Sequence, residues 1–252
     1  PPNMVRPHLV LLGAGASYAA FPNGDRNGRK LPLMINFVET VGMESLANET
    51  GIDWKGRNFE EFYSDLFDDP SKDKFRREVE EFVFDYFAHL EIPDEPTIYD
   101  YLILSLREKD IIATFNWDPF LILTMMRNAR FVRPPQFLFL HGNTAFAYTY
   151  KADGTLRISP VRPNDKTLPS GYQRCPLLYP VRKKDYQTDP LTRQHWKWVA
   201  QQLKNAFVIS IFGYGAPSSD GEAVRLLRDA WGTPEERNLE EVEIIDRPGM
   251  GE

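Results

Sequence analysis

The sequence predicts an α/β fold with a Rossmann-like parallel sheet, because strand-like apolar runs alternate with helical patterns along the chain. Five runs are expected as strands, near residues 8–13, 110–115, 136–140, 206–212 and 242–246. Small or polar residues follow each run directly. Open parallel sheets bind ligands beyond the carboxyl ends of their strands, so these residues are the first candidates for a site.

Length and composition indicate one domain with insertions. A chain of 252 residues, 42% of them hydrophobic, can bury one substantial core. We therefore predict a single domain over residues 1–252. Residues about 22–95 carry several amphipathic patterns and predict an inserted helical subdomain. Residues about 144–190 are rich in Pro, Gly, Asp and Lys and predict an irregular insertion that covers the site or meets a neighbour.

The first strand runs into a glycine-rich turn and then into a helical pattern. Glycines let the backbone approach a diphosphate, and a helix N-terminus offers free N–H groups and a partial positive charge. The third glycine of the common fingerprint is absent, because position 18 is Tyr18, so a tight turn without a ligand is the alternative interpretation. The candidate residues of this turn are Gly13, Ala14, Gly15, Ala16 and Ser17.

Each of the later strands also ends in candidate site residues. A further carboxylate, Asp25, follows in the loop after the first helical pattern. Because parallel strands end at one edge of the sheet, the side chains after the four later strands are expected to meet the first turn. They are Thr114, Phe115, Asn116, Asp118, His141, Gly213, Tyr214, Gly215, Ser218 and Asp246.

Several of these residues have a purely structural alternative. Asn116 and Asp118 could cap the helix that begins near Pro119, because Asp at an N-cap followed by Pro is a common helix start. His141 could be a buried histidine whose hydrogen bonds are satisfied at a strand end. Asp246 could be a charged residue that simply closes a strand.

Four of these elements, in this order, resemble the sirtuin family of NAD-consuming domains. The segment 13–17 resembles the opening glycine motif of the family, and 114–118 has the spacing of its Thr-x-Asn-x-Asp motif. His141 and Gly142 stand where the catalytic His-Gly pair of the family follows a strand. The loop 213–219 resembles the later phosphate and ribose loop.

The resemblance covers residues about 8–247 and shows two departures. Deacetylating sirtuins carry four cysteines that hold a structural zinc, whereas this chain has only Cys175, so we expect no metal. Where a deacetylase has Pro-Asp-Phe-Arg, residues 21–26 read Phe-Pro-Asn-Gly-Asp-Arg. Both departures disfavour peptide deacylation. The pattern is more similar to the divergent branch of bacterial antiviral defence systems, whose members hydrolyse NAD.

The resemblance implies NAD as the substrate and a role for each candidate residue. Nicotinamide is a cationic leaving group, so cleavage mainly requires that the ring be oriented and the oxocarbenium charge tolerated. Asn116 suits orienting a ribose hydroxyl or water, and His141 suits accepting a proton near neutral pH. Asp118 is assigned to the carboxamide, and Asp246 to the adenosine ribose. The residues assigned to cofactor binding are Gly13, Ala14, Gly15, Ala16, Ser17, Asp25, Thr114, Phe115, Gly213, Tyr214, Gly215, Ser218 and Asp246.

We therefore predict an NAD glycohydrolase that releases nicotinamide and ADP-ribose and acts as the effector of an antiphage system. The alternatives are an NAD-dependent protein deacylase or ADP-ribosyltransferase, and a non-enzymatic sensor of NAD or ADP-ribose. Cyclisation of the ADP-ribosyl intermediate is also open, because it begins with the same bond cleavage. Control is expected through a homo-oligomer or through a sensor partner such as a DNA-translocating ATPase or a short Argonaute protein.

Charge and cysteine content exclude other classes. A formal charge of −6 disfavours direct binding of nucleic acid, which requires clustered Lys and Arg. A single cysteine excludes an internal disulfide framework and fits a reducing compartment. The chain has no signal peptide and no apolar run approaching about 20 residues. We therefore expect a cytoplasmic protein with no membrane contact.

Overall fold

A computed structural model of the chain describes residues 6–161, 167–181, 189–216, 220–236 and 239–246. Its centre is a five-stranded sheet in which every neighbouring pair is parallel, with the strand order β3-β2-β1-β7-β8. The strands are β1 (His8–Leu12), β2 (Ile111–Thr114), β3 (Gln136–Phe139), β7 (Val208–Phe212) and β8 (Glu241–Ile245). The predicted fold class is confirmed, because all five expected strands join one parallel sheet.

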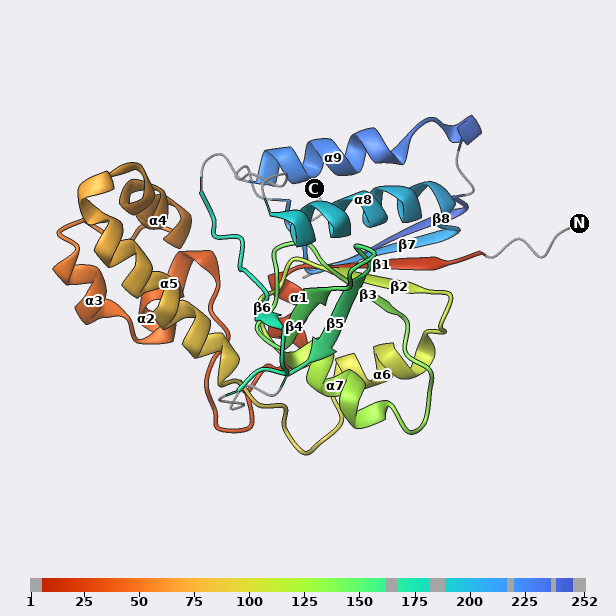
Figure 1. Ribbon diagram of the computed structural model, residues 1–252, viewed down its shortest axis with the longest axis horizontal. Coiled ribbons are helices and arrows are strands. Elements are labelled where there is room, and N and C mark those ends of the chain that lie inside the picture. Colours follow the sequence, from red (N-terminus) through yellow and green to blue (C-terminus); the bar gives the residue numbers. More distant parts are fainter. Residues whose placement is uncertain (1–5, 162–166, 182–188, 217–219, 237–238, 247–252) are drawn as a thin grey trace, which may run out of the picture.

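Helices cover both faces of this sheet, as a parallel sheet requires (Figure 1). The helices α8 (Pro190–Asn205) and α9 (Gly221–Trp231) lie on one face, where Leu9 and Leu11 pack in one cluster with apolar side chains of α8. The opposite face carries α1 (Ala14–Ala20), α6 (Ile98–Ser105) and α7 (Phe120–Asn128), and Val10 and Leu12 belong to that core. Burial on both faces explains why the central strands β1 and β2 are almost entirely apolar, whereas the edge strand β8 contains Glu241 and Glu243 and is exposed at every position.

The strand order reverses between β1 and β7. From β1 the chain proceeds through β2 to β3 at one edge, and it then crosses to β7 and β8 on the other side of β1. In open α/β sheets such a switch point leaves a crevice at the carboxyl ends of the two central strands. Gly13 and Gly213 follow those two strands, so the two glycine loops lie next to each other at the crevice.

The first excursion, between α1 and α6, is helical and lies beside the sheet in Figure 1. The start of α4 is set by the Asn58 side chain, which accepts hydrogen bonds from the N–H groups of Glu60 and Glu61 at 2.8 and 3.3 Å. Its buried face is aromatic, with Phe59, Phe62 and Tyr63 in the core. The elements of the excursion are η1 (Met34–Asn36), α2 (Phe37–Val41), α3 (Glu44–Glu49), α4 (Phe59–Asp68), η2 (Pro70–Lys72) and α5 (Asp73–Ala88).

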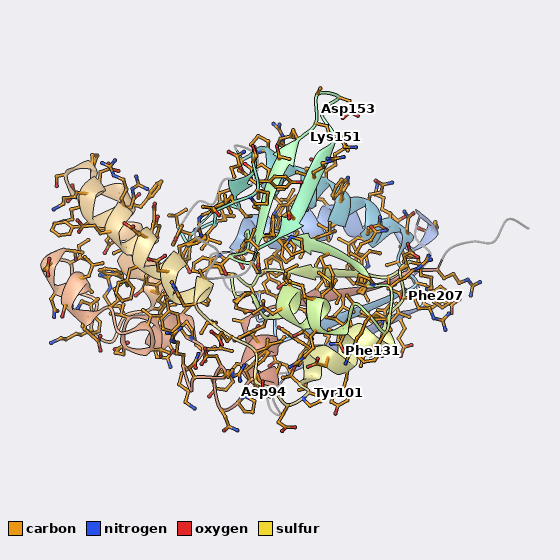
Figure 2. The ribbon with its side chains drawn as sticks, turned by 60° about the horizontal axis from the view of Figure 1, so that its bottom comes forward. Asp94, Tyr101, Phe131, Lys151, Asp153 and Phe207 are labelled. Atoms are coloured by element: carbon orange, nitrogen blue, oxygen red, sulfur yellow. The ribbon has the colours of Figure 1, made fainter. Side chains whose placement is uncertain are left out.

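The second excursion differs from the irregular segment expected from its composition. It forms a three-stranded antiparallel sheet in the order β5-β4-β6, from β4 (Phe146–Tyr150), β5 (Leu156–Pro160) and β6 (Gln173–Arg174). The turn between β4 and β5 is closed by a hydrogen bond from the N–H of Thr155 to Asp153 Oδ1 at 2.8 Å. Figure 2 shows this turn, marked by Lys151 and Asp153, projecting far from α2–α5. One more short helix, η4 (Pro234–Glu236), precedes β8.

The helices in the described part of the chain include none that is long and apolar enough to cross a membrane.

Candidate functional site

A cavity of about 670 Å³ opens at the carboxyl edge of the parallel sheet. This volume falls within the range of small-molecule sites. Loops that follow all five strands contribute to its wall, so the structure brings together most of the residues singled out in the sequence. The candidate residues that line it are Gly13, Ala14, Gly15, Ser17, Phe115, Asn116, Asp118, His141, Gly213, Tyr214, Gly215 and Asp246.

These residues form a row that follows the strand order. His141 stands beyond β3, Asn116 beyond β2, Gly13 beyond β1, Gly213 beyond β7 and Asp246 beyond β8. Neighbouring strands lie about 4.8 Å apart, so four spacings extend over roughly 19 Å. An extended ligand can therefore contact all five loops at once. The polar wall is suited to a dinucleotide-sized molecule lying across the strand ends.

The Asn116 side chain is held in one orientation. Its Nδ2 donates to the Gly13 carbonyl and to Ser17 Oγ, both at 2.9 Å. A carbonyl can only accept, so the NH₂ group faces Gly13 and the amide is not reversed. Its backbone N–H is bound by Thr114 Oγ1 at 3.0 Å. Both amide protons are thus used within the protein, and the amide oxygen is the atom left for a ligand in the cavity.

Asp118 is almost fully buried and forms part of the cavity wall. Its Oδ2 accepts a hydrogen bond from Ser17 Oγ at 2.7 Å, and its Oδ1 accepts one from the Phe120 N–H at 3.2 Å. Burial raises the pKa of the Asp118 carboxyl to about 6, although these two hydrogen bonds oppose the shift. The bond to Phe120 is the helix-start contact considered as the alternative. Asp118 therefore has a structural role at α7 together with its place beside Ser17.

Tyr99 is a member of this cluster that the sequence analysis missed. Its hydroxyl lies 2.7 Å from Ser17 Oγ and 3.5 Å from Asn116 Nδ2. The single proton of Ser17 goes to Asp118, so Ser17 Oγ accepts from Tyr99 and from Asn116. Burial raises the pKa of Tyr99 well above its usual value, which keeps the hydroxyl a donor. No motif marks Tyr99, because it lies in the first turn of α6, which does not directly follow a strand.

His141 lies on the cavity wall, 7% exposed, with Asn116 at 8% and Asp118 at 5%. Its ring packs edge-on against Phe115, with centroids 5.0 Å apart at 73°. Its carbonyl accepts the N–H of Leu178 at 2.9 Å. The neighbouring Gly142 has φ +80°, and a Cβ there would lie 1.9 Å from the Pro176 carbonyl oxygen. The glycine of the His-Gly pair therefore lets the second excursion close over His141.

The two glycine loops touch backbone to backbone. The N–H of Gly15 donates to the Gly213 carbonyl at 2.9 Å, and the N–H of Ala16 donates to the Gly13 carbonyl at 3.0 Å. A Cβ on Gly13 would lie 2.4 Å from the Gly213 oxygen, and one on Gly213, at φ +62°, would lie 2.1 Å from the Ala16 nitrogen. The glycines are thus required for close packing of the loops, and two N–H groups expected for a diphosphate have partners inside the protein.

An aromatic pair lies beside this contact. The rings of Phe115 and Tyr214 are stacked, with centroids 4.1 Å apart and planes 6° from parallel. The Tyr214 hydroxyl donates to Asp220 Oδ2 at 3.3 Å. Asp220 is 4% exposed and lines the cavity, and the sequence analysis did not select it. The stack thus supports His141 from one side and ties the loop after β7 to the start of α9.

Three of the expected binding residues lie elsewhere. Asp25 does not line the cavity, because its carboxylate holds its own loop through the N–H groups of residues 27 and 29 at 2.8 Å and of residue 91 at 3.2 Å. The Thr114 hydroxyl serves the turn before Asn116. Ala16 is buried in the core below the loop. Ser218 lies outside the residues that the structure describes.

The other half of the cavity is apolar, and it comes from the two excursions. Trp117, from the loop after β2, completes this wall, and its buried Nε1 has no hydrogen-bond partner among the described residues. Leu178 and Pro180 come from the second excursion, which therefore contributes to the wall of the cavity. The helical excursion also supplies Glu60. The further apolar lining residues are Leu31, Pro32, Leu33, Met34, Phe37 and Phe87.

The charged side chains among the described lining residues are mainly acidic. Among the described residues, the ionisable lining side chains are His141, the tyrosines and four carboxylates, and neither Lys nor Arg contributes. The described part of the chain also contains no group of three or more His, Cys, Asp or Glu side chains that could hold a metal ion. The lining carboxylates are those of Glu60, Asp118, Asp220 and Asp246.

No protein-family model and no curated protein matches the chain. Among solved structures, it is similar to a Sir2 homologue in complex with NAD, with a TM-score of 0.43 and 14% identity over 93% of this chain and 83% of the other. A structure from work on the mechanism and regulation of Sir2 enzymes gives 0.43 and 13% over 97% and 84%. Sir2Tm bound to a propionylated peptide gives 0.37 and 15% over 98% and 86%. Because all three TM-scores are below 0.5, we argue the function from the residues of this chain.

Proposed function

We propose that this protein is an NAD glycohydrolase with a sirtuin-like site, which cleaves NAD to nicotinamide and ADP-ribose. The observation that carries the proposal is the fixed Asn116 amide, held by Gly13 and Ser17 with its oxygen left for a ligand. It lies next to His141 along a cavity that extends across five strand ends. A row of this length suits a dinucleotide better than a single nucleotide.

In the proposed reaction the bond between the ribose C1′ and the nicotinamide nitrogen breaks, and its electron pair leaves with nicotinamide. The leaving ring was a cation and becomes neutral, so the positive charge moves to the ribosyl oxocarbenium. Carboxylates in the lining stabilise that developing charge. Water then attacks C1′, and its proton passes to His141 or to solvent.

Asn116 orients the reacting groups in this scheme. An amide oxygen fixed as an acceptor can bind a ribose hydroxyl or the attacking water and hold it in line with C1′. Positioning of this kind requires that the amide itself not rotate, which the two hydrogen bonds from Nδ2 ensure. The His141 ring packs edge-on against Phe115, which in turn stacks on Tyr214, so its orientation is also restricted.

The test is chromatographic detection of nicotinamide and ADP-ribose after incubation of the purified protein with NAD. We expect release by the natural sequence and a loss of at least about 100-fold in Asn116→Ala and His141→Ala. His89→Ala is the matched control, because His89 lies on the helical excursion and does not line this cavity. Full activity in Asn116→Ala would remove the basis of the proposal.

A second candidate, NAD-dependent removal of an acyl group from a protein, is favoured by the apolar half of the cavity. That half could hold an acyl chain against Phe37, Phe87 and Trp117. The same assay separates the two functions. A deacylase releases nicotinamide faster when an acyl-lysine peptide is added, and it forms an acylated ADP-ribose. A glycohydrolase releases nicotinamide at the same rate with and without the peptide and forms unmodified ADP-ribose.

The biological role that we propose is that of a toxic effector in antiviral defence, controlled by self-association or by a sensor partner. Free NAD hydrolysis would harm the host cell, so control is a requirement of the activity itself. The test is to express the protein with and without phage challenge and to measure cellular NAD. Unchanged NAD under challenge, with an enzyme active in vitro, would contradict the role while leaving the chemistry intact.

A further inference from the structure

Residues 176–181 of the second excursion, which we call the strap, contact both the His141 loop and the helical excursion. The N–H of Leu178 donates to the His141 carbonyl at 2.9 Å. Leu178 and Pro180 line the cavity, whereas Tyr179 between them does not, so the Tyr179 side chain has contacts of another kind. The inference drawn from those contacts rests on the proposed function, because it concerns how His141 is held for the reaction.

The side chains of the strap alternate between the two cores of the molecule. Leu177, Tyr179 and Val181 pack against the core that includes the helical excursion. Leu178 packs against the other core, which contains apolar side chains of α8. Such alternation is typical of an extended segment, in which successive side chains point to opposite sides. The strap therefore connects the two cores next to the His141 loop.

The Tyr179 ring anchors the strap on the helical excursion. It stacks on Tyr63 of α4, with centroids 5.1 Å apart and planes at 23°, and it also packs against Trp117, with centroids 5.1 Å apart at 51°. Its hydroxyl donates to the Glu80 carbonyl of α5 at 2.8 Å. Tyr63 is 2% exposed, and its own hydroxyl donates to the Glu80 carboxylate, so the ring beneath Tyr179 is fixed. Tyr179 therefore ties α4 and α5 to the strap.

At its other side the strap touches the His141 loop through the backbone. Besides the hydrogen bond from Leu178, the Pro176 carbonyl oxygen lies where a Cβ on Gly142 would be only 1.9 Å away. A shift of the strap would therefore displace His141. Proton transfer requires the imidazole to lie within hydrogen-bond reach of its partner, and a misplacement of about 1 Å can cost about 100-fold in rate. We propose that Tyr179 is a positioning residue, which fixes the strap and through it places His141 for the reaction.

The experiment compares kcat and KM for NAD in three variants. Tyr179→Ala removes the ring and its contacts, so we expect kcat to fall at least about tenfold while KM changes less than about threefold. Tyr179→Phe keeps the ring and loses only the hydrogen bond to Glu80, so it should recover most of the lost kcat. Tyr150→Ala is the matched control, because Tyr150 lies on β4 of the same excursion, packs against Tyr148 and does not line the cavity. An unchanged kcat or a change in KM alone in Tyr179→Ala, or an equal fall of kcat in Tyr150→Ala, would overturn the inference.

Nuclear magnetic resonance of the imidazole rings tests the position of His141 without turnover. The chain has four histidines, so the signals that disappear in His141→Ala are assigned to His141. We expect these signals to shift in Tyr179→Ala and to stay in place in Tyr150→Ala, and unshifted signals in Tyr179→Ala would contradict the role of Tyr179. If the natural sequence cleaves no NAD but the signals shift as expected, the proposed function fails and the positioning role stands. Tyr179→Leu, which keeps an apolar side chain without the ring, takes the place of Tyr179→Ala in both measurements if the alanine variant does not fold.

Discussion

Ser17 is the residue through which the polar side chains of the site are connected. Its hydroxyl donates to Asp118 and accepts from Asn116 and Tyr99. All hydrogen-bonding positions of the hydroxyl are therefore filled, and the three partners come from α6 and from the loop after β2. A polar cluster that is fully satisfied fixes its members rigidly, which is the property required of the amide that faces the substrate.

The burial of Asp118 has a measurable consequence for stability. The folded pKa, about 6, lies above the unfolded value of about 3.9, so the folded state holds the proton longer. The unfolding free energy then falls as pH rises from about 4 to 6, by about 3 kcal/mol for this group, and levels off above. Urea unfolding at pH 4 and pH 8 should show this loss in the natural sequence but not in Asp118→Asn. Parallel pH dependence in both would contradict the burial of an ionisable Asp118.

Tyr99 should matter for stability more than for catalysis. In Tyr99→Phe the Ser17 hydroxyl loses one donor but keeps Asn116 and Asp118, so we expect destabilisation of about 1 kcal/mol and a loss in kcat of less than about tenfold. Denaturant unfolding and the nicotinamide assay measure the two effects. A kcat as low as that of Asn116→Ala would show instead that the Tyr99 hydroxyl takes part in the reaction.

The residues predicted from the sequence were those at strand ends. Asn116, Asp118 and His141 stand directly after β2 and β3, where the apolar pattern marks the edge of the sheet. Asp25 also lies in a loop, but its oxygens are used by nearby N–H groups, and one sequence cannot distinguish a carboxylate that holds a turn from one that faces a ligand. Tyr99 could not be predicted from the sequence, because its partners are distant along the chain. Ser17 is 82 residues away and Asn116 is 17 residues away.

At the scale of elements, the contact between the two glycine loops decides whether the crevice can form. The Gly13 and Gly213 backbones approach so closely that neither position tolerates a side chain without movement of the other loop. The loops belong to β1 and β7, the two strands at the switch point. The glycine pattern therefore predicts the close contact of the two loops, even though the N–H groups of Gly15 and Ala16 bind backbone carbonyls within the protein.

Substitution of glycines within one loop tests this requirement. Gly213→Ala combines φ +62° with a Cβ 2.1 Å from the Ala16 nitrogen, and we expect destabilisation of more than about 2 kcal/mol together with loss of NAD turnover. Gly215→Ala is the matched control, because a Cβ there meets nothing within 4 Å. Its unfolding free energy should change by less than about 0.5 kcal/mol. Similar stability of the two variants in denaturant unfolding would mean that the loops can separate.

The antiparallel sheet of the second excursion could not be predicted from the sequence pattern. The alternation in 146–150 is short, and the Pro and Gly residues that surround it are typical of loops. The partner strand is set by the turn around Asp153 and by pairing of Tyr148 with Ile158, which the composition does not reveal. The helices of the first excursion were easier to predict from the sequence, because their amphipathic patterns are longer.

At the scale of the whole molecule, one bound ligand would contact the parallel sheet and both excursions at once. The parallel sheet supplies the polar row, and the two excursions supply the apolar wall. Binding of ADP-ribose should therefore stabilise the whole domain. At a concentration 100 times its Kd the gain is about 2.7 kcal/mol, which corresponds to an increase in Tm of about 5–10 °C.

Differential scanning fluorimetry with and without ADP-ribose measures this increase. Lys151→Ala is the control, since Lys151 lies at the projecting turn in Figure 2 and should retain the full shift. In Asn116→Ala the increase in Tm caused by ADP-ribose should be smaller. An identical shift with inorganic diphosphate alone would contradict binding of the whole dinucleotide across the strand ends.

The row of strand ends also orders events in time. Among the members of the row, Gly13 is synthesised before Asn116, His141 and Gly213, whereas Asp246 follows β8 and is synthesised last. A nascent chain that has not reached residue 246 has the reacting groups but lacks the wall beside the adenosine. We therefore expect ribosome-bound chains that end before β8 to release no nicotinamide from NAD, so that a potentially toxic activity begins only after β8 has been synthesised.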